Sequence, residues 1–169
     1  MSTKAAISLF ARRGSLVGGL LVSALLASPG AARAQSFDLM EATIAGVHEA
    51  FDAGTLTCRE LVQRYLDRIE AYDDVGPGLN AIQHVNPRAL AKADSLDRAR
   101  EAQGRQGKLH CVPVLLKDQV ETRDMPTTYG SAIFDGFVSH RDATIVRRLR
   151  AAGAIILAKT TMGEFAQRY

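Results

Sequence analysis

Apolar residues between positions 35 and 169 switch between helical and strand-like spacing. Residues 39–51 and 57–69 carry apolar side chains every three or four positions, which predicts two amphipathic helices. Thr57 and Glu60 have the spacing of a capping box, so the second helix is expected to begin at Thr57. Residues 80–85 alternate and predict a strand.

The second half of the chain repeats this change of period. Asn86 and Pro87 predict the start of a helix that Gly104 ends. Two short apolar strands are then expected, over residues 112–116 and 154–158, with a polar loop and a helix between them. A second capping-box pattern predicts one more helix after the last strand; its residues are Thr161, Met162, Gly163 and Glu164.

The order of these elements predicts an α/β fold whose apolar strands are buried on both faces. A lysine ends each of the two apolar strands, Lys117 and Lys159. Burial of the Lys117 amine at the edge of an apolar core would disfavour the ammonium form and suit the lysine to act as a base. The alternative is a surface lysine paired with Asp118 or another carboxylate. Lys159 has a structural interpretation, as the partner of a nearby carboxylate or helix end.

Residues 1–34 have the pattern of an export signal. Lys4, Arg12 and Arg13 precede the uncharged apolar stretch 16–27, and Ala32-Arg33-Ala34 has the small-x-small pattern of a cleavage site. We therefore expect a periplasmic or secreted protein without a stable membrane anchor after cleavage. An uncleaved anchor is the alternative. The arginine pair is similar to a twin-arginine signal, but the choice between the Tat and Sec routes stays open.

Charge argues against a nucleic-acid partner. The chain has 21 basic and 18 acidic residues, and the four basic residues in positions 1–34 leave 17 against 18, a net charge of −1. The four histidines have no metal-ligand spacing, and glycine-rich nucleotide motifs are absent, so neither a metal nor a cofactor is predicted. Cys58 and Cys111 are either a disulfide or two buried small side chains.

Four blocks in the second half resemble the amidase signature family. They are Val-Pro-Val-Leu-Leu-Lys-Asp (112–118), Met-Pro-Thr-Thr-Tyr-Gly-Ser (125–131), Asp-Ala-Thr-Ile-Val-Arg-Arg-Leu-Arg-Ala-Ala-Gly-Ala-Ile-Ile-Leu (142–157) and Lys-Thr-Thr-Met-Gly-Glu-Phe-Ala (159–166). The resemblance implies an α/β/α sandwich with a mixed central sheet and a helical N-terminal region. Residues 35–169 would be its N-terminal part, and the chain the front part of something longer.

The resemblance also implies a hydrolase that cleaves carboxylic amides with a Ser–cis-Ser–Lys triad. Lys117 matches the family's lysine, whereas both serines would lie beyond Tyr169, so residues 35–169 alone are expected to be inactive. Ser131 belongs to another block and is not assigned as the nucleophile. Met125, Tyr129 and Ser131 are candidates for binding a small-molecule amide, and Met125, Tyr129 and Ile133 would suit an apolar acyl group. Packing of this loop on its own domain is the alternative.

Two positions depart from the family pattern. Cys111 stands where a glycine is usual, and Thr161 stands where an asparagine is usual; neither is expected to touch Lys117. Two other functions stay open beside the exported amidase. One is the glutamine-hydrolysing component of a tRNA-linked amidotransferase, and the other is a non-catalytic, truncated relative. The substrate and the oligomeric state cannot be predicted from these residues.

Overall fold

The computed structural model describes residues 37–167, and the predicted export signal lies outside this range. The described part contains four α-helices and three strands, in the order α1 (Ile44–Asp52), α2 (Cys58–Ile69), β1 (Ile82–Val85), α3 (Ala89–Gln103), β2 (Pro113–Lys117), α4 (Thr144–Ala151) and β3 (Ile155–Thr160). A π-helical turn, Glu70–Asp74, extends α2, and two 3₁₀ turns follow β2 and β3 (Ala132–Phe134 and Glu164–Ala166).

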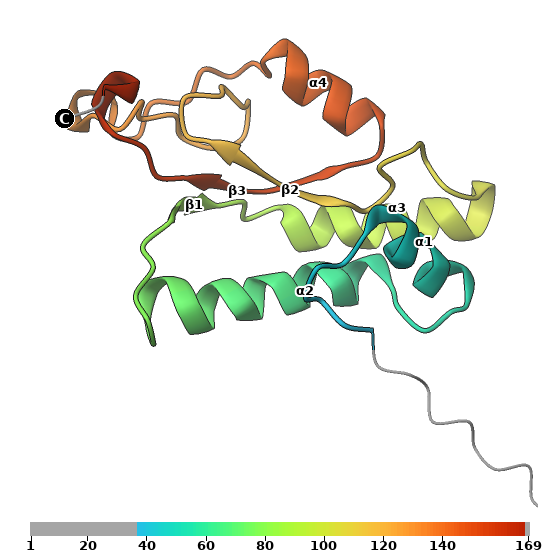
Figure 1. Cartoon of the computed structure of the whole chain (residues 1–169). Coiled ribbons are helices and arrows are strands. Elements are labelled where there is room, and N and C mark those ends of the chain that lie inside the picture. Colours follow the sequence, from blue (N-terminus) through green and yellow to red (C-terminus); the bar gives the residue numbers. More distant parts are fainter. Residues whose placement is uncertain (1–36, 168–169) are drawn as a thin grey trace, which may run out of the picture. The chain divides into compact units, whose positions relative to one another are not determined.

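The three strands form a mixed sheet in the order β1-β3-β2. β3 lies in the centre, antiparallel to β1 and parallel to β2. The parallel pair needs a crossover connection, and the loop after β2 together with α4 provides it. Helices α1, α2 and α3 cover one side of the sheet and α4 lies on the other (Figure 1). The predicted α/β class is therefore confirmed, as a small mixed sheet between helices.

Two apolar clusters pack against the two faces of the sheet. The larger cluster joins α1, α2 and α3 to β3; among its buried members are Phe51, Leu61, Val62, Ala93, Ile155 and Leu157. The smaller cluster joins α4 to the opposite face through Leu116, Met125, Val146 and Ile156. Ile155 and Ile156 belong to different clusters because successive side chains of a strand point to opposite faces. Burial on both faces is thus confirmed for β3.

The prediction of burial on both faces is wrong for β2. This strand lies at the edge of the described sheet, and the side chain of Leu115 is 50% exposed. Pro113 is its first residue. Proline has no backbone N–H, and sheets tolerate it at the first residue of a strand and in edge strands. The apolar run therefore predicts the strand correctly, but it does not distinguish an edge strand from a central one.

The capping signals predict some helix starts and miss others. The capping box of Thr57 and Glu60 forms at the start of α2, with the Thr57 hydroxyl accepting from the Glu60 N–H and the Glu60 carboxylate accepting from the Thr57 N–H. α1 begins later than predicted, because the Thr43 hydroxyl caps the chain there. α3 begins at Ala89, not at Pro87.

The second predicted capping box does not form. Glu164–Ala166 is a short 3₁₀ turn without a side-chain cap. The Thr161 hydroxyl instead donates to the backbone carbonyl oxygens of Asn80 and Ala81, so it fastens the end of β3 to the segment before β1. Across residues 37–167, no helix combines the length and the apolar character needed to cross a bilayer.

Candidate active site

Lys117 lies at the carboxyl end of β2. Because β2 and β3 are parallel, their carboxyl ends meet at one edge of the sheet, and Lys117 pairs with Thr160 there. The Lys117 side chain is exposed, and its Nζ donates a hydrogen bond to the backbone carbonyl oxygen of Thr161 at 2.5 Å. Among residues 37–167, no carboxylate lies within ion-pair distance of this amine. The amine is therefore accessible, and a backbone oxygen orients it.

The prediction that the Lys117 amine is buried is therefore wrong. Lys117 was expected at the edge of an apolar core, whereas the lysine that the core encloses is Lys159, with an exposed fraction of 0%. Lys159 Nζ donates to the carbonyl oxygens of Asp118 (2.8 Å) and Pro126 (3.1 Å) and to the Thr127 hydroxyl (3.0 Å). Burial lowers the pKa of Lys159, and the nearby Asp118 charge opposes that shift.

A β-bulge explains why Lys159 points where it does. Val114 pairs with Ile156 but Leu115 pairs with Ala158, so β3 carries one extra residue at this point. The extra residue brings Lys159 opposite Leu116, on the sheet face that holds Ile156 and α4. Strict alternation would have put Lys159 on the other face, with Ile155 and Leu157. The sequence carries no visible signal of this bulge.

Asp118 follows Lys117 and turns into the protein. Its carboxylate is completely buried, and Oδ1 lies 3.7 Å from Lys159 Nζ. Oδ2 accepts from the Thr128 backbone N–H (3.0 Å), the Thr128 hydroxyl (2.7 Å) and the Gly130 N–H (3.3 Å). The alternative in which Asp118 pairs with Lys117 is therefore wrong. Asp118 ties the loop after β2 to the end of the strand.

The three candidates for substrate binding lie in different surroundings. Met125 is 1% exposed and packs in the core beside α4, as the loop-packing alternative expects. The Ser131 hydroxyl is buried and donates to Glu164 Oε1 at 2.7 Å. The Tyr129 hydroxyl donates to Glu121 Oε1 at 3.0 Å, and partial burial followed by this carboxylate raises the pKa of Tyr129.

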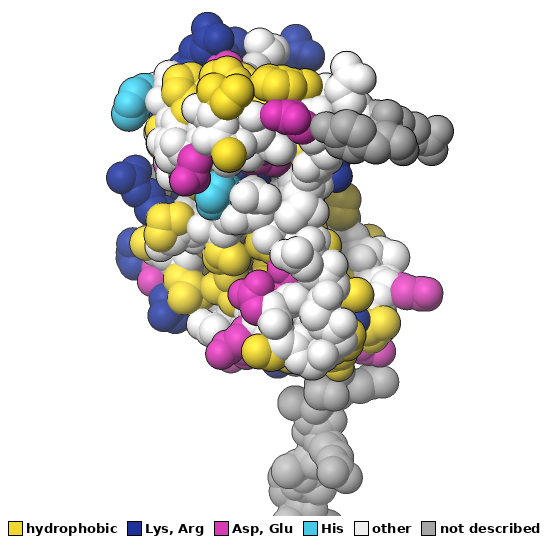
Figure 2. Space-filling model, turned by 90° about the vertical axis from the view of Figure 1, so that its left-hand side faces the viewer, with side chains coloured by type: hydrophobic (Ala, Val, Ile, Leu, Met, Phe, Trp, Pro, Cys, Tyr) yellow, Lys and Arg dark blue, Asp and Glu magenta, His cyan; other side chains and the backbone are white. Residues whose placement is uncertain are grey.

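Of these three candidates, Tyr129 lines a cavity. The cavity measures about 720 Å³ and lies between the loop after β2, the start of α4 and the segment after β3; Gln119, Glu121, Arg141, Arg147, Met162 and Phe165 also line it. Figure 2 shows the side of the molecule toward which the carboxyl ends of β2 and β3 point, with hydrophobic side chains exposed among charged ones. Ile133, on the loop that precedes α4, is 81% exposed.

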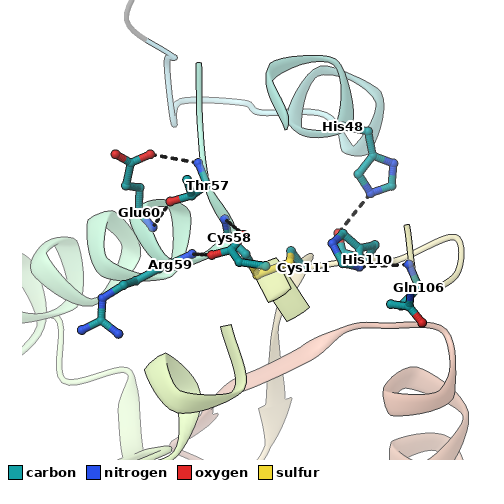
Figure 3. The surroundings of a disulfide bond; sticks show 9 residues. His48, Thr57, Cys58, Arg59, Glu60, Gln106, His110 and Cys111 are labelled. Carbon is teal, nitrogen blue, oxygen red and sulfur yellow. Dashed lines mark hydrogen bonds between the residues drawn. A yellow bond between two sulfur atoms is a disulfide. The ribbon is translucent and has the colours of Figure 1, made fainter. Parts of the chain in front are cut away.

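Cys58 and Cys111 form a disulfide, which resolves the open choice between a bridge and two free thiols (Figure 3). The bridge joins the first residue of α2 to the turn before β2. Cys111 has φ +61°, the left-handed region that favours glycine, which explains why glycine is usual at this position in the family. The cysteine therefore replaces a residue that suits the backbone better, and it gains a covalent link to α2.

The same residues form the only group of three potential metal ligands found among residues 37–167. It consists of Cys58, Cys111 and the Asp97 carboxylate. The two sulfurs are bonded to each other, and Asp97 accepts from the backbone N–H groups of Cys58 (2.8 Å) and Arg59 (3.0 Å) at the start of α2. Their chemistry is that of a structural link and a helix cap.

Thr161, the other departure from the family pattern, does touch Lys117, contrary to expectation. The contact is made by the Thr161 backbone carbonyl, while its side chain binds the segment before β1. The departure from the family pattern therefore concerns the side chain that anchors the segment after β3, whereas the group that binds Lys117 belongs to the backbone.

The fold is thus a mixed sheet between helices, with the accessible Lys117 at the end of the edge strand β2. The buried ion pair of Lys159 and Asp118 lies next to it. The chain matches the amidase family model over residues 60–169, so it belongs to the amidase signature family. It is 41% identical over 154 residues to a probable amidase of Arabidopsis thaliana, an alignment that covers 87% of this chain and 30% of the plant protein.

Other relatives include both kinds of enzyme considered above. The A-type subunit of glutamyl-tRNA(Gln) amidotransferase from Streptomyces coelicolor is 40% identical over 130 residues, with 76% of this chain and 26% of that protein covered. The solved structure of peptide amidase from Stenotrophomonas maltophilia is similar, with a TM-score of 0.71 and 42% identity over 74% of this chain and 26% of that chain. The chain thus spans between a quarter and a third of the length of these relatives.

Proposed function

We propose that this chain supplies Lys117 as the base of an amidase with a Ser–cis-Ser–Lys triad, which hydrolyses the C–N bond of carboxylic amides. Membership of the family and the match of residues 112–118 to the family's lysine block support this proposal. The two serines come from outside the 169 residues, in keeping with the limited share of each relative that the chain covers. Residues 35–169 would then form the N-terminal part of an α/β/α sandwich, as the helices on both sides of the sheet suggest.

One observation carries the assignment of the base to Lys117 rather than Lys159. A lysine that removes a proton through a serine must lie within hydrogen-bond reach of that hydroxyl. The Lys117 amine is accessible at the edge of the sheet, whereas Lys159 Nζ is enclosed by three protein oxygens. Lys159 therefore has no free direction in which to bind an incoming serine.

The proposed reaction proceeds in two stages. Neutral Lys117 accepts a proton from the bridging serine, which in turn accepts the proton of the nucleophilic serine as that oxygen attacks the amide carbonyl carbon. The C–N bond breaks, and the proton returns to the departing amine. Water then attacks the acyl-enzyme by the same proton route, releasing the carboxylic acid and regenerating the serine.

We further propose that the protein is exported, with residues 1–34 as its signal. The Cys58–Cys111 disulfide supports this, because disulfides form and persist in oxidising compartments. The rival function is that of the glutamine-hydrolysing component of an amidotransferase, which the similarity to the Streptomyces coelicolor protein favours. An export signal and a disulfide both favour a hydrolase that acts alone over one component of a tRNA-linked assembly.

Ammonia release from carboxamides by the purified protein tests the proposed function. We expect a polypeptide that joins this chain to its serine-bearing segment to hydrolyse simple carboxamides and peptide amides without partner subunits. Residues 35–169 alone are expected to release none. Hydrolysis by residues 35–169 would show that the serines are supplied otherwise, and activity restricted to glutamine in the presence of partner subunits would favour the amidotransferase. A continuation without two spaced serines would indicate a non-catalytic relative.

A further inference from the structure

We propose that the buried pair Lys159–Asp118 positions Lys117, because it fixes both partners of the hydrogen bond that orients the Lys117 amine. The inference deepens the proposed function and rests on it for the catalytic meaning of Lys117. Lys159 and Asp118 are positioning residues in this account, and neither touches the substrate.

The donor side of the hydrogen bond is fixed through Asp118, the residue next to Lys117. Its backbone N–H donates to the Thr160 carbonyl at 3.0 Å, and its own carbonyl accepts from Lys159 Nζ at 2.8 Å. Both backbone polar groups of Asp118 are thus held by β3. The N–H belongs to the peptide unit that follows Lys117 and the carbonyl to the next unit, so the backbone on the C-terminal side of Lys117 is held at two successive points.

The acceptor side is linked to the same pair along the backbone of β3. Thr161, whose carbonyl oxygen accepts the hydrogen bond of the Lys117 amine, lies two residues after Lys159, just past the end of β3. The Thr161 N–H donates to the Ala81 carbonyl at 2.9 Å, which holds this residue from the other side. The position of the Lys117 amine is therefore set by a short chain of contacts, from Lys159 to Asp118 on one side and from Lys159 along β3 to Thr161 on the other.

The pair also holds the loop that faces this edge. Lys159 Nζ binds the Pro126 carbonyl and the Thr127 hydroxyl, and the Asp118 carboxylate binds Thr128 and Gly130. Gly130 has φ +72°, and a Cβ there would lie 2.6 Å from the Met162 carbonyl oxygen, so the loop packs directly on the segment after Thr161. The end of β2, the loop 126–130 and the end of β3 thus meet around one buried charge pair.

A purely stabilising role explains this arrangement poorly. Both side chains are completely buried, and removing two charges from water costs free energy that their attraction offsets only in part. Well-packed apolar residues would fill such a site at equal or lower free energy. The directional hydrogen bonds, which apolar residues cannot provide, are what the pair adds. They hold the Asp118 backbone next to Lys117, and they hold the loop 126–130 that packs on Met162, the residue after Thr161.

The test is an NMR measurement on the chain labelled with ¹³C-lysine. The sequence has five lysines, and a Lys117→Arg variant assigns the Lys117 signals. The double variant Lys159→Met/Asp118→Asn removes both charges together, so the net charge is unchanged, and asparagine keeps an acceptor for the Thr128 and Gly130 N–H groups. Lys108→Met, at an exposed lysine in the turn after α3, is the matched control.

We expect the double variant to fold and the order parameter of the Lys117 side-chain Cε to fall to that of the exposed Lys108 in the unsubstituted chain. The Lys108→Met control should leave the Lys117 value unchanged. A folded double variant in which the Lys117 order parameter is unchanged overturns the proposal. If the double variant does not fold, Lys159→Gln/Asp118→Asn replaces it, because glutamine keeps polar atoms at the site but is shorter than lysine and carries no charge. The Lys117 value must then fall, and an unchanged value again overturns the proposal.

The enzymatic consequence is measured separately in the polypeptide that carries the serines. The double variant should lower kcat at least about tenfold and leave KM within about twofold, since orientation of the base acts on the chemical step. Loss of Lys117 order in a protein without any amidase activity would leave the positioning role standing and refute the proposed function. An active enzyme, together with a Lys117 order parameter that is unchanged in the double variant, would refute the positioning role and leave the proposed function standing.

Discussion

The disulfide between Cys58 and Cys111 gives the most quantitative prediction. It closes a loop with a sequence separation of 53 residues, between the start of α2 and the turn before β2. For a loop of this length, the chain-entropy model gives a loss of denatured-state entropy equivalent to about 4 kcal/mol at 25 °C. Since small domains are stable by only about 5–15 kcal/mol, the bridge supplies a large share of the total.

Urea unfolding of residues 35–169 measures this contribution. With a urea dependence of about 2 kcal/mol per molar, Cys58→Ser/Cys111→Ser should unfold at a midpoint about 2 M lower than the oxidised chain. Reduction of the unsubstituted chain should produce a similar fall. A midpoint that changes by less than about 0.5 M would refute the reasoning, because the loop closure would then be supplied by other contacts.

A second variant separates the bridge from the backbone at Cys111. In Cys58→Ser/Cys111→Gly, glycine removes the strain of the left-handed conformation at φ +61°, which stabilises the folded state by about 1–2 kcal/mol. Glycine also gives the unfolded chain more conformational freedom, which lowers the free energy of unfolding by about 0.5–1 kcal/mol. This variant should therefore be more stable than the double serine variant by roughly 0.5–1 kcal/mol. Equal stability would mean that position 111 is not strained.

The remaining predictions concern a loop and a histidine. Gly130→Ala should destabilise the chain by about 2 kcal/mol or more, because its Cβ would meet the Met162 carbonyl oxygen at 2.6 Å. Gly136→Ala is the control: this glycine has the same φ of +72° but open space around it, so the variant should cost only about 1 kcal/mol. Equal shifts of the thermal unfolding midpoint in the two variants would contradict this prediction. Burial lowers the pKa of His110 below its ordinary 6.5. As the pH falls through 6.5, the unfolded chain therefore binds more protons at His110 than the folded chain does, so the free energy of unfolding should fall between about pH 7.5 and about pH 5. In His110→Asn this fall should be less steep. An equal dependence of stability on pH in both proteins would show that His110 does not cause it.

The fold was predictable where local chemistry decides it. The capping box at Thr57, the apolar run that becomes β3 and the glycine that ends α3 all act within a few residues, and each is found where the pattern places it. The predicted capping box at Thr161 failed because the hydroxyl has a competing tertiary partner in the segment before β1. An apolar run likewise cannot tell that β2 lies at the edge of the described sheet.

The site was predictable only in part for a similar reason. The motif blocks identify Lys117, but its exposure depends on the position of β2 in the sheet, which the local sequence does not specify. Lys159 has the same local signature, a lysine at the end of an apolar strand. Its burial results from a bulge in β3 and from a loop that folds back over it, both of which are properties of the assembled sheet.

The central claim is that Lys117 is the base of an amidase, and turnover by a Lys117→Ala variant tests it most directly. The measurement uses the polypeptide that includes the serine-bearing segment, with Lys108→Ala as the control on an exposed lysine remote from this edge. We predict that kcat falls by about 10²–10⁴-fold in Lys117→Ala, with the unfolding midpoint unchanged, while Lys108→Ala retains full activity. A Lys117→Ala protein that turns over amides within a few-fold of the unsubstituted enzyme would contradict the account.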